Sequence, residues 1–382
     1  MINYATLGSL ITPAKVIRCG KGSFPVLSMT MRNGIVMQSE RFKKSLASTD
    51  QSDYKVVKRG QLVVGFPIDE GVLYVQKAAD EGIMSPAYNV WDIDSEMIDP
   101  DFLELCLHSP QSMQYYKNKL RGTTARRRSI PVSDLQALEI RLPDMQTQRE
   151  IVAIMKKAEA IFAHRREQLD YYEQLVKSRF IELFGDPLSN DKGWQKVVIT
   201  KVCHAVFGGG TPSKSHPEYF TGSIPWVSPK DIKSSVINDS IDHITEEAIA
   251  HSTTNLVPAN SVLMVIRSGI LKHTLPVAIN SLPVTINQDM KAFVPNETVK
   301  TAFLMYLFKA IENDVLAGVR GVTADNIDFK AFQKRTIIVP PLELQEQFAA
   351  FVEQTDKSKL AVQKGLQELE ILKKSLMQQY FG

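Results

Sequence analysis

Two long stretches of the chain share one pattern of apolar and polar positions. In residues 144–185 and 342–382 a stripe recurs at alternating steps of four and three residues, the spacing of the contact edge between two paired helices. In the first stretch the stripe consists of Ile151, Met155, Ala158, Phe162, Arg165, Leu169, Tyr172, Val176, Arg179 and Leu183. In the second it consists of Phe348, Val352, Thr355, Val362, Leu366, Leu369, Leu376 and Tyr380. The pattern predicts two long helices, each with one edge that faces another helix.

The two stretches are also copies of one another. A constant offset of 197 residues, without a gap, relates Pro143 to Pro340, Gln148 to Gln345, Leu169 to Leu366, Lys177-Ser178 to Lys374-Ser375 and Phe184-Gly185 to Phe381-Gly382. A proline precedes each helix and a glycine follows Phe184, which marks the helix limits. A single amphipathic helix could equally pack on its own domain. Two helices of matched length favour pairing with each other.

The segment before each helix has a different pattern. Short apolar runs typical of β-strands alternate with turn residues and occupy positions 55–64, 72–76, 261–266 and 284–286. One helix follows in each segment, over about residues 101–120 and 301–315. Both segments have the size of an ordinary mixed α/β domain. The sequence therefore predicts a domain over residues 1–143, a helix over 144–185, a second domain over 186–341 and a second helix over 342–382.

The order of these segments limits how they can be arranged. The first helix leaves the first domain and enters the second, whereas the second helix can only return. Antiparallel pairing would place a domain at each end of a coiled coil and relate the domains by a pseudo-twofold axis. Symmetric dimers use this arrangement to address two half-sites on a DNA duplex. Because the two domains differ in sequence, their half-sites should differ, which predicts an asymmetric, divided target.

Composition narrows the class of protein. Of the 382 residues 44% are hydrophobic and 23% charged, which is typical of a folded chain too long for one core. No apolar run could span a bilayer and no secretory signal begins the sequence, so we expect a cytoplasmic protein without a membrane. The three cysteines lie far apart, which disfavours disulfides and zinc. The net charge of +3 permits nucleic-acid binding without requiring it.

The sequence lacks the motifs of catalysis on DNA. An adenine methyltransferase needs an Asn/Asp-Pro-Pro-aromatic tetrapeptide, and residues 339–342 (Val-Pro-Pro-Leu) lack its polar and aromatic ends. The glycine-rich phrase at 208–214 lacks the Gly-Lys-Ser/Thr ending of a phosphate loop, and Pro212 and Pro217 disfavour a helix after it. A surface turn or a contact to the DNA backbone is a better interpretation. The histidines at 204, 216, 243, 251 and 273 lack the spacing of metal ligands. We predict no catalytic, cofactor-binding or metal-binding residues.

Arginines cluster after the helix of the first domain. A predicted loop contains six candidate DNA contacts with no acidic residue among them: Arg121, Thr123, Thr124, Arg126, Arg127 and Arg128. Arginine binds phosphates without regard to sequence and also reads guanine. A charged run is often only a solvated surface, but a cluster without acids favours DNA. Alanine at positions 126–128 should weaken DNA binding and flatten its salt dependence.

The second domain offers a more dispersed set of candidate DNA contacts. They are hydroxyl or cationic residues near the glycine-rich phrase, at strand ends and in loops: Thr211, Ser213, Lys214, Lys230, Arg267, Ser268, Lys272 and Thr323. Arg267 is the strongest candidate for base reading, because it follows an apolar strand and precedes a glycine.

The order and duplication of these segments resemble the specificity subunits of type I restriction–modification systems, over essentially the whole chain. The resemblance rests on residues 143–148 (Pro-Asp-Met-Gln-Thr-Gln), 340–345 (Pro-Pro-Leu-Glu-Leu-Gln), 175–178 (Leu-Val-Lys-Ser) with Phe184-Gly185, 208–213 (Gly-Gly-Gly-Thr-Pro-Ser), 224–228 (Ile-Pro-Trp-Val-Ser) and 230–232 (Lys-Asp-Ile). The first domain departs from the family because it lacks the glycine-rich phrase, so its DNA contacts are harder to place.

The resemblance implies a non-catalytic DNA-reading subunit. Each target-recognition domain would read half of a bipartite sequence in double-stranded DNA, while the helices set the spacer and dock two copies of a DNA adenine methyltransferase subunit. A separate restriction or translocase subunit would join through them. S-adenosylmethionine, ATP and magnesium would all be bound by these partners and not by this chain.

Two other functions stay open. One is an assembly adaptor whose coiled coil joins subunits without reading DNA, and apolar helix positions such as Ile151, Ile154, Phe348 and Phe351 could await such partners. This adaptor would give no sequence-dependent DNA affinity. The other is a self-contained DNA-modifying enzyme, which the missing motifs disfavour and which cofactor binding by the isolated chain would support.

Overall fold

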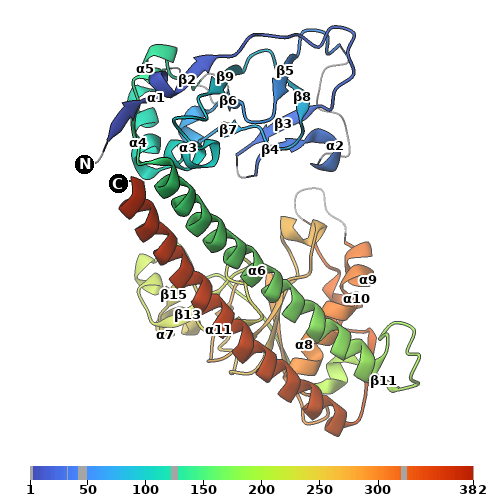
Figure 1. Ribbon diagram of the computed structural model, residues 1–382. Coiled ribbons are helices and arrows are strands. Elements are labelled where there is room, and N and C mark those ends of the chain that lie inside the picture. The colour runs from blue at the N-terminus through green and yellow to red at the C-terminus, as the bar shows by residue number, and fades with distance from the viewer. Residues whose placement is uncertain (1–2, 32, 42–49, 122–127, 320–324, 382) are drawn as a thin grey trace. The chain divides into compact units, whose positions relative to one another are not determined.

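The computed structural model describes residues 3–31, 33–41, 50–121, 128–319 and 325–381. The chain forms two compact units, Met1–Arg165 with Lys364–Gly382, and Arg166–Gln363 (Figure 1). Each unit combines a mixed α/β domain with part of two 40-residue helices, α6 (Met145–Phe184) and α11 (Leu342–Phe381). The predicted fold class, mixed α/β with two long paired helices, is therefore confirmed. The division into domains at residues 143, 185 and 341, and the pseudo-twofold axis, stay predictions.

The first unit is built on an antiparallel sheet. Its strands lie in the order β2 (Ile11–Pro13), β9 (Asn89–Ile93), β6 (Leu62–Val64) and β7 (Leu73–Val75). Three antiparallel pairs accompany it: β1 (Tyr4–Thr6) with β10 (Glu139–Arg141), β3 (Leu27–Thr30) with β4 (Gly34–Met37), and β5 (Lys55–Lys58) with β8 (Glu81–Met84). The helices are α1 (Leu7–Leu10), α2 (Gln38–Arg41), the 3-10 turn η1 (Ile68–Glu70), α3 (Pro100–Leu107), α4 (Pro110–Lys119) and α5 (Val132–Gln136).

The second unit has a larger sheet. Its five strands lie in the order β12 (Cys203–Gly208), β19 (Met290–Pro295), β16 (Val262–Val265), β17 (Val277–Asn280) and β14 (Val236–Ile237). Smaller sheets join β15 (His243–Ile244), β13 (Ile224–Val227) and β18 (Thr285–Ile286), and β11 (Gln195–Val198) with β20 (Thr336–Val339). The helical elements are η3 (Ile199–Val202), η4 (Pro217–Phe220), α7 (Glu246–Ala250), η5 (Gly269–Lys272), α8 (Thr301–Ala310), α9 (Glu312–Ala317) and α10 (Phe329–Phe332).

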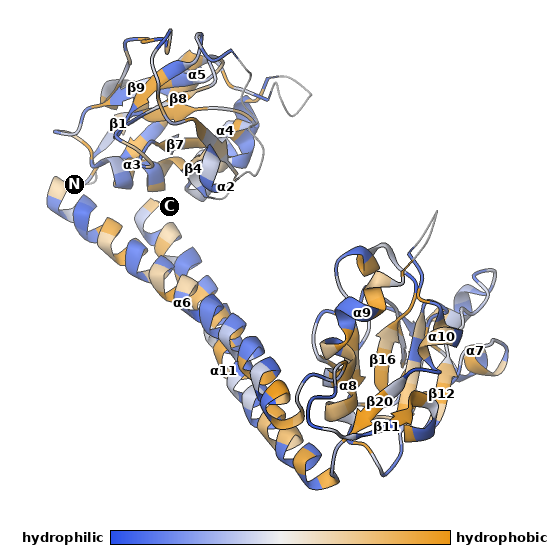
Figure 2. Cartoon of the chain, turned by 90° about the vertical axis from the view of Figure 1, so that its right-hand side faces the viewer, coloured by the Kyte–Doolittle hydropathy of each residue, from blue (hydrophilic) through white to orange (hydrophobic). Residues whose placement is uncertain are grey.

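The core of the second unit lies between its large sheet and α8. Phe293 of β19 packs against Phe308 of α8 with ring centroids 5.0 Å apart, and all four residues of β16 are buried. Figure 2 shows this hydrophobic interior in orange along β16 and α8. Burial on both faces explains why β16 is a continuous apolar run without alternation.

The predicted strands are present, but the predicted domain helices are interrupted. Strands lie within all four apolar runs, and the run at 55–64 is divided into β5 and β6. The helix predicted over residues 101–120 is two helices, because Pro110 starts α4 and the hydroxyl of Ser109 caps it by accepting from the Ser112 N–H at 3.2 Å. The helix predicted over 301–315 is likewise divided into α8 and α9, at Ile311.

The two long helices pack against each other in antiparallel fashion (Figures 1 and 2). In the first unit the start of α6, with Ile151 and Met155, shares a core with Phe381 at the end of α11. In the second unit the order is reversed, since Phe180 near the end of α6 packs on Phe348 near the start of α11 at 5.4 Å. Of the predicted contact stripe only Arg165 is exposed. The stripe prediction is therefore confirmed.

A buried glutamine joins each domain to the start of its helix. In the first unit Gln148 accepts a hydrogen bond from the Asp99 N–H at 2.8 Å and donates to the carbonyls of Met97 at 3.2 Å and Pro143 at 2.8 Å. In the second, Gln345 accepts from the Lys300 N–H at 2.8 Å and donates to Thr298 at 3.2 Å and Pro340 at 2.8 Å. Both glutamines are fully buried. We call this repeated arrangement the glutamine clamp.

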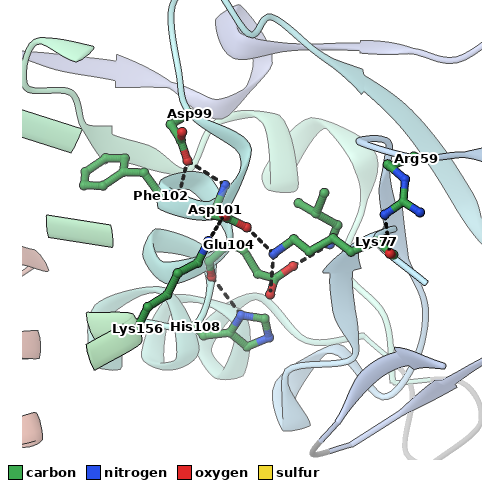
Figure 3. Close-up of polar contacts among 9 residues, drawn as sticks. Arg59, Lys77, Asp99, Asp101, Phe102, Glu104, His108 and Lys156 are labelled. Carbon is green, nitrogen blue, oxygen red and sulfur yellow. Dashed lines mark hydrogen bonds and ion pairs between the residues drawn. The ribbon is translucent and has the colours of Figure 1, made fainter. Parts of the chain in front are cut away.

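In the first unit, ion pairs add to the clamp (Figure 3). Asp99 caps α3 by accepting from the backbone N–H groups of Asp101 and Phe102. Asp101 then pairs with Lys156 of α6 and with Lys77, each at 2.5 Å. Lys77 also reaches Glu104, at 3.3 Å. The start of α3 is thereby tied both to the sheet and to α6.

Candidate nucleic-acid interface

The arginine loop of the first unit is only partly described. Its two ends are joined by backbone hydrogen bonds between Arg121 and Ser129, at 2.9 and 3.3 Å, and Arg121 is exposed. Four of its predicted contacts lie outside the described residues: Thr123, Thr124, Arg126 and Arg127.

Arg128 has a different environment from the one its sequence neighbours suggest. Its guanidinium pairs with Asp69 at 2.5 Å through Nη1 and with Glu70 through Nη2, and its side chain is only 26% exposed. The cluster is therefore free of acids along the chain but not in space, because η1 brings two carboxylates to it. Both terminal nitrogens of Arg128 hold the loop to its own domain. DNA binding by this residue stays a prediction that the ion pairs disfavour.

The glycine-rich phrase of the second unit is a close-packed loop. A Cβ atom on Gly209 would lie 1.7 Å from the carbonyl oxygen of Asn287, so only glycine fits there. The Gly210 N–H donates to the Ile286 carbonyl at 3.0 Å, and its own carbonyl accepts from Trp226 Nε1 at 3.0 Å. The phrase leads to the short 3-10 turn η4 and not to an α-helix. Its glycines bring the loop against the turn after β18, which is a packing role.

That turn, residues 287–289 between β18 and β19, brings two of the predicted contacts together. The Thr211 hydroxyl donates to Oε1 of Gln288, and Arg267 Nε donates to Oδ1 of Asp289 at 2.5 Å. Thr211, Gln288 and Arg267 are exposed. Hydroxyl, amide and guanidinium groups are the side chains that read base edges in the major groove.

The other predicted contacts of the second unit form no hydrogen bond or ion pair with this turn in the described residues; they have other partners or are exposed. Ser268 caps η5 by accepting from the Ile270 N–H at 3.4 Å, and Lys272 lies 3.8 Å from Asp325. Ser213 contacts Ser215 at 2.6 Å, and Lys214 and Lys230 are exposed. Thr323 lies outside the described residues.

Sequence reasoning missed Gln288 and Asp289. A usable signal was present, because both follow directly after the apolar run at 284–286, where polar side chains reach the end of a sheet. The partnership with Arg267 was not visible, since Asp289 lies 22 positions away.

A cavity of about 680 Å³ in the second unit has a different electrostatic character. Its lining includes Lys177, Lys309 and Lys359 and none of the predicted contacts that the structure describes. Burial, and then the charge of Lys359, lower the pKa of Lys309, whereas burial raises the pKa of nearby Asp356. In the described part of the chain no three His, Cys, Asp or Glu residues are grouped to hold a metal ion. No helix described by the structure has the length and apolar character to cross a membrane.

A known protein-family model matches most of the second unit. Residues 191–371 match the family model of the type I restriction modification DNA specificity domain. The chain is 35% identical over 239 residues to the type I restriction enzyme EcoR124I/EcoR124II specificity subunit of Escherichia coli, a match that covers 59% of this chain and 56% of that protein. Over these residues the chain is similar to the specificity subunits of type I restriction–modification systems, and it spans a little over half the length of the Escherichia coli relative. The predicted resemblance to type I specificity subunits agrees with these matches.

Further type I proteins are similar to the chain over more of its length. The HindI specificity subunit of Haemophilus influenzae is 20% identical over 368 residues, 76% of this chain and 79% of that protein. A structure of the type I R-M system, solved for its complex assembly and conformational transition, matches with a TM-score of 0.61 at 18% identity, covering 100% of this chain and 97% of that one. The type I S subunit from M. genitalium matches with a TM-score of 0.57 at 13% identity, covering 100% and 96%. These two structures share the fold of this chain.

Proposed function

We propose that this chain is the DNA-reading subunit of a type I complex. Target-recognition domains over residues 1–143 and 186–341 each read one half of a bipartite DNA sequence, and α6 and α11 set the spacing between the halves. The observation that carries the proposal is the duplication of the frame: the same helix and the same glutamine clamp follow two domains of different sequence. A repeated frame with diverged domains suits a reader of two different half-sites.

In this proposal the two domains contact DNA through the residues predicted from sequence. Arg121, Arg126 and Arg127 supply phosphate contacts in the first domain, and Arg267 reads a base edge in the second. The exposed Arg267 beside the Gln288 turn supports this role, because both residue types match donor and acceptor patterns of bases. Lysines such as Lys214 and Lys230, which are exposed, would add sequence-independent affinity.

The long helices are the proposed docking surface for two adenine methyltransferase subunits, through which a restriction or translocase subunit would join. S-adenosylmethionine, ATP and magnesium would be bound by those partners. Eight apolar side chains on the helices are at least 40% exposed and support this role: Ile154, Ile161, Tyr171, Ile181, Leu342, Leu360, Ile371 and Leu372. Two positions expected to await partners, Ile151 and Phe348, are instead buried in the cores of their own units.

A single-molecule methylome tests the proposal. A host that expresses this chain with its methylation subunit is compared with a host that lacks only this chain. A divided, asymmetric motif with methylated adenine, lost without the chain, is the expected result. An unchanged methylome in a host where the complex assembles would contradict DNA reading and favour the adaptor.

A further inference from the structure

The turn at residues 287–289 is held rigidly from behind. Asn287 is buried, and its N–H donates to the Val227 carbonyl of β13 at 2.9 Å. The Asn287 carbonyl oxygen occupies the space that Gly209 leaves open by lacking a Cβ. The Asp289 carbonyl accepts from the N–H groups of Ile266 and Arg267, at 2.8 and 3.2 Å. The segment directly after β16, which carries Arg267, is therefore fixed to the turn by backbone hydrogen bonds.

The side chain of Asp289 is oriented by the same turn. Its N–H donates to Asn287 Oδ1 at 3.1 Å, and its Oδ2 faces Asn287 Nδ2 at 3.4 Å. Its other oxygen, Oδ1, accepts from Arg267 Nε at 2.5 Å. Asp289 is 22% exposed and Arg267 48% exposed, so the carboxylate lies inside and the guanidinium reaches outward.

This geometry leaves a defined edge of the guanidinium for a ligand. Arginine carries five N–H donors in a planar fork, and the described contact occupies the one on Nε. The Nη1 and Nη2 edge is the edge that binds O6 and N7 of guanine in a bidentate manner. A long, flexible side chain loses conformational freedom when it binds, and a carboxylate that fixes the plane beforehand lowers that loss.

We propose that Asp289 is a positioning residue, which holds Arg267 for bidentate recognition of one guanine in the half-site read by the second domain. This inference rests on the proposed function, because it requires that the second domain reads DNA. Arg128 of the first unit has no such role, since acids engage both of its terminal nitrogens.

The test uses the chain assembled with its methylation subunits and duplexes that contain the motif found by the methylome. Affinity is measured by fluorescence anisotropy for the intact target and for duplexes in which each guanine in turn is replaced by 7-deazaguanine, which lacks N7. The variants are Arg267→Ala, Asp289→Ala and the more conservative Asp289→Asn. Asp314→Ala is the control, because it removes another exposed Arg–Asp pair of the same unit, with Arg335.

The loss of affinity on 7-deazaguanine replacement should occur at one guanine of the target. Replacing it removes N7 but keeps O6, so binding of the wild-type complex should weaken about 2- to 13-fold, the range for one hydrogen bond, and binding of Arg267→Ala should not change. Asp289→Ala should lose most of this discrimination with the salt dependence of binding unchanged, and Asp289→Asn should retain part of it. Asp314→Ala should behave as wild type.

Two results would overturn the inference while leaving the proposed function intact. One is that Asp289→Ala loses as much affinity as the wild type when each guanine is replaced by 7-deazaguanine. The other is an equal loss for all duplexes accompanied by a lower melting temperature, which would make Asp289 a structural residue only. If the wild-type complex shows no sequence-dependent affinity at all, the proposed function fails and this inference fails with it.

Discussion

Two arginines in this chain meet carboxylates in opposite ways. Arg267 engages Asp289 through its inner Nε, whereas Arg128 places Nη1 on Asp69 and Nη2 on Glu70. In our proposal the first arrangement prepares a side chain for a ligand, whereas the second holds the end of a loop to its own domain. The presence of an arginine in a candidate interface is therefore less informative than which of its nitrogens is engaged.

Arg128→Ala should lower stability more than it lowers DNA affinity. The substitution leaves Asp69, which is 10% exposed, and Glu70 without their cation, at a cost of about 1–3 kcal/mol. Thermal melting of the full chain measures this loss, with the exposed Arg121→Ala as control. If Arg128→Ala instead melts as wild type and reduces the salt dependence of DNA binding, Arg128 contacts phosphate.

Asp101 should make the first unit sensitive to acid. Burial opposes its charged form, but hydrogen bonds from Lys156 and Lys77 hold its pKa below the ordinary value. A lowered pKa in the folded state gives stability that is complete above the ordinary value near 4 and is lost as the pH falls through the folded value.

Asp101→Asn should therefore cost about 0.5–1 kcal/mol near neutral pH, and this difference from wild type should shrink below about pH 4. Melting temperatures across that range measure it. A difference that stays constant with pH would mean that the ion pairs contribute nothing and that only packing was altered.

At the scale of elements, the glutamine clamp is the joint between each domain and its helix. Each glutamine meets the residue just before a domain helix, Asp99 before α3 and Lys300 before α8, and also the carbonyl of the proline before α6 or α11. One side chain thus fixes two helix starts at once. This explains why glutamine recurs at positions 148 and 345 while the domains around it diverge.

Gln345→Ala should destabilise the second unit by about 2–4 kcal/mol, because it leaves the partly buried Lys300 N–H without this acceptor and opens a cavity at the buried Gln345. Gln148→Ala should do the same in the first unit. Gln347→Ala, at an exposed position two residues further on, is the matched control. Unfolding in urea, followed separately for the two units by hydrogen exchange, measures the effect. Equal free energies of unfolding for Gln345→Ala and Gln347→Ala would show that the glutamine clamp does not stabilise the second unit.

For the whole molecule, the sequence predicted what depends on local periodicity and repetition. The helix stripe and the apolar strands follow from spacings of a few residues. The glycine after Phe184 predicted the end of the first long helix, and Gly185, at φ 73°, does follow the last residue of α6. What could not be predicted depends on contacts between distant positions. Gln148 meets Asp99 across 49 residues, and Arg128 meets Asp69 across 59. The two carboxylates beside Arg128 could not be foreseen for this reason, and Asp289 was missed for the same one.

The first unit is assembled from the two ends of the sequence. Its core includes Phe381, whose ring lies 5.5 Å from that of Phe102, and Arg141 donates to the Gln379 carbonyl at 3.0 Å. Residues 166–363, which build the second unit, are translated in between. At ordinary rates of synthesis this interval lasts roughly 10–40 seconds. The first domain therefore leaves the ribosome with part of its core open to chaperones, and it is completed only when the final turns of α11 emerge.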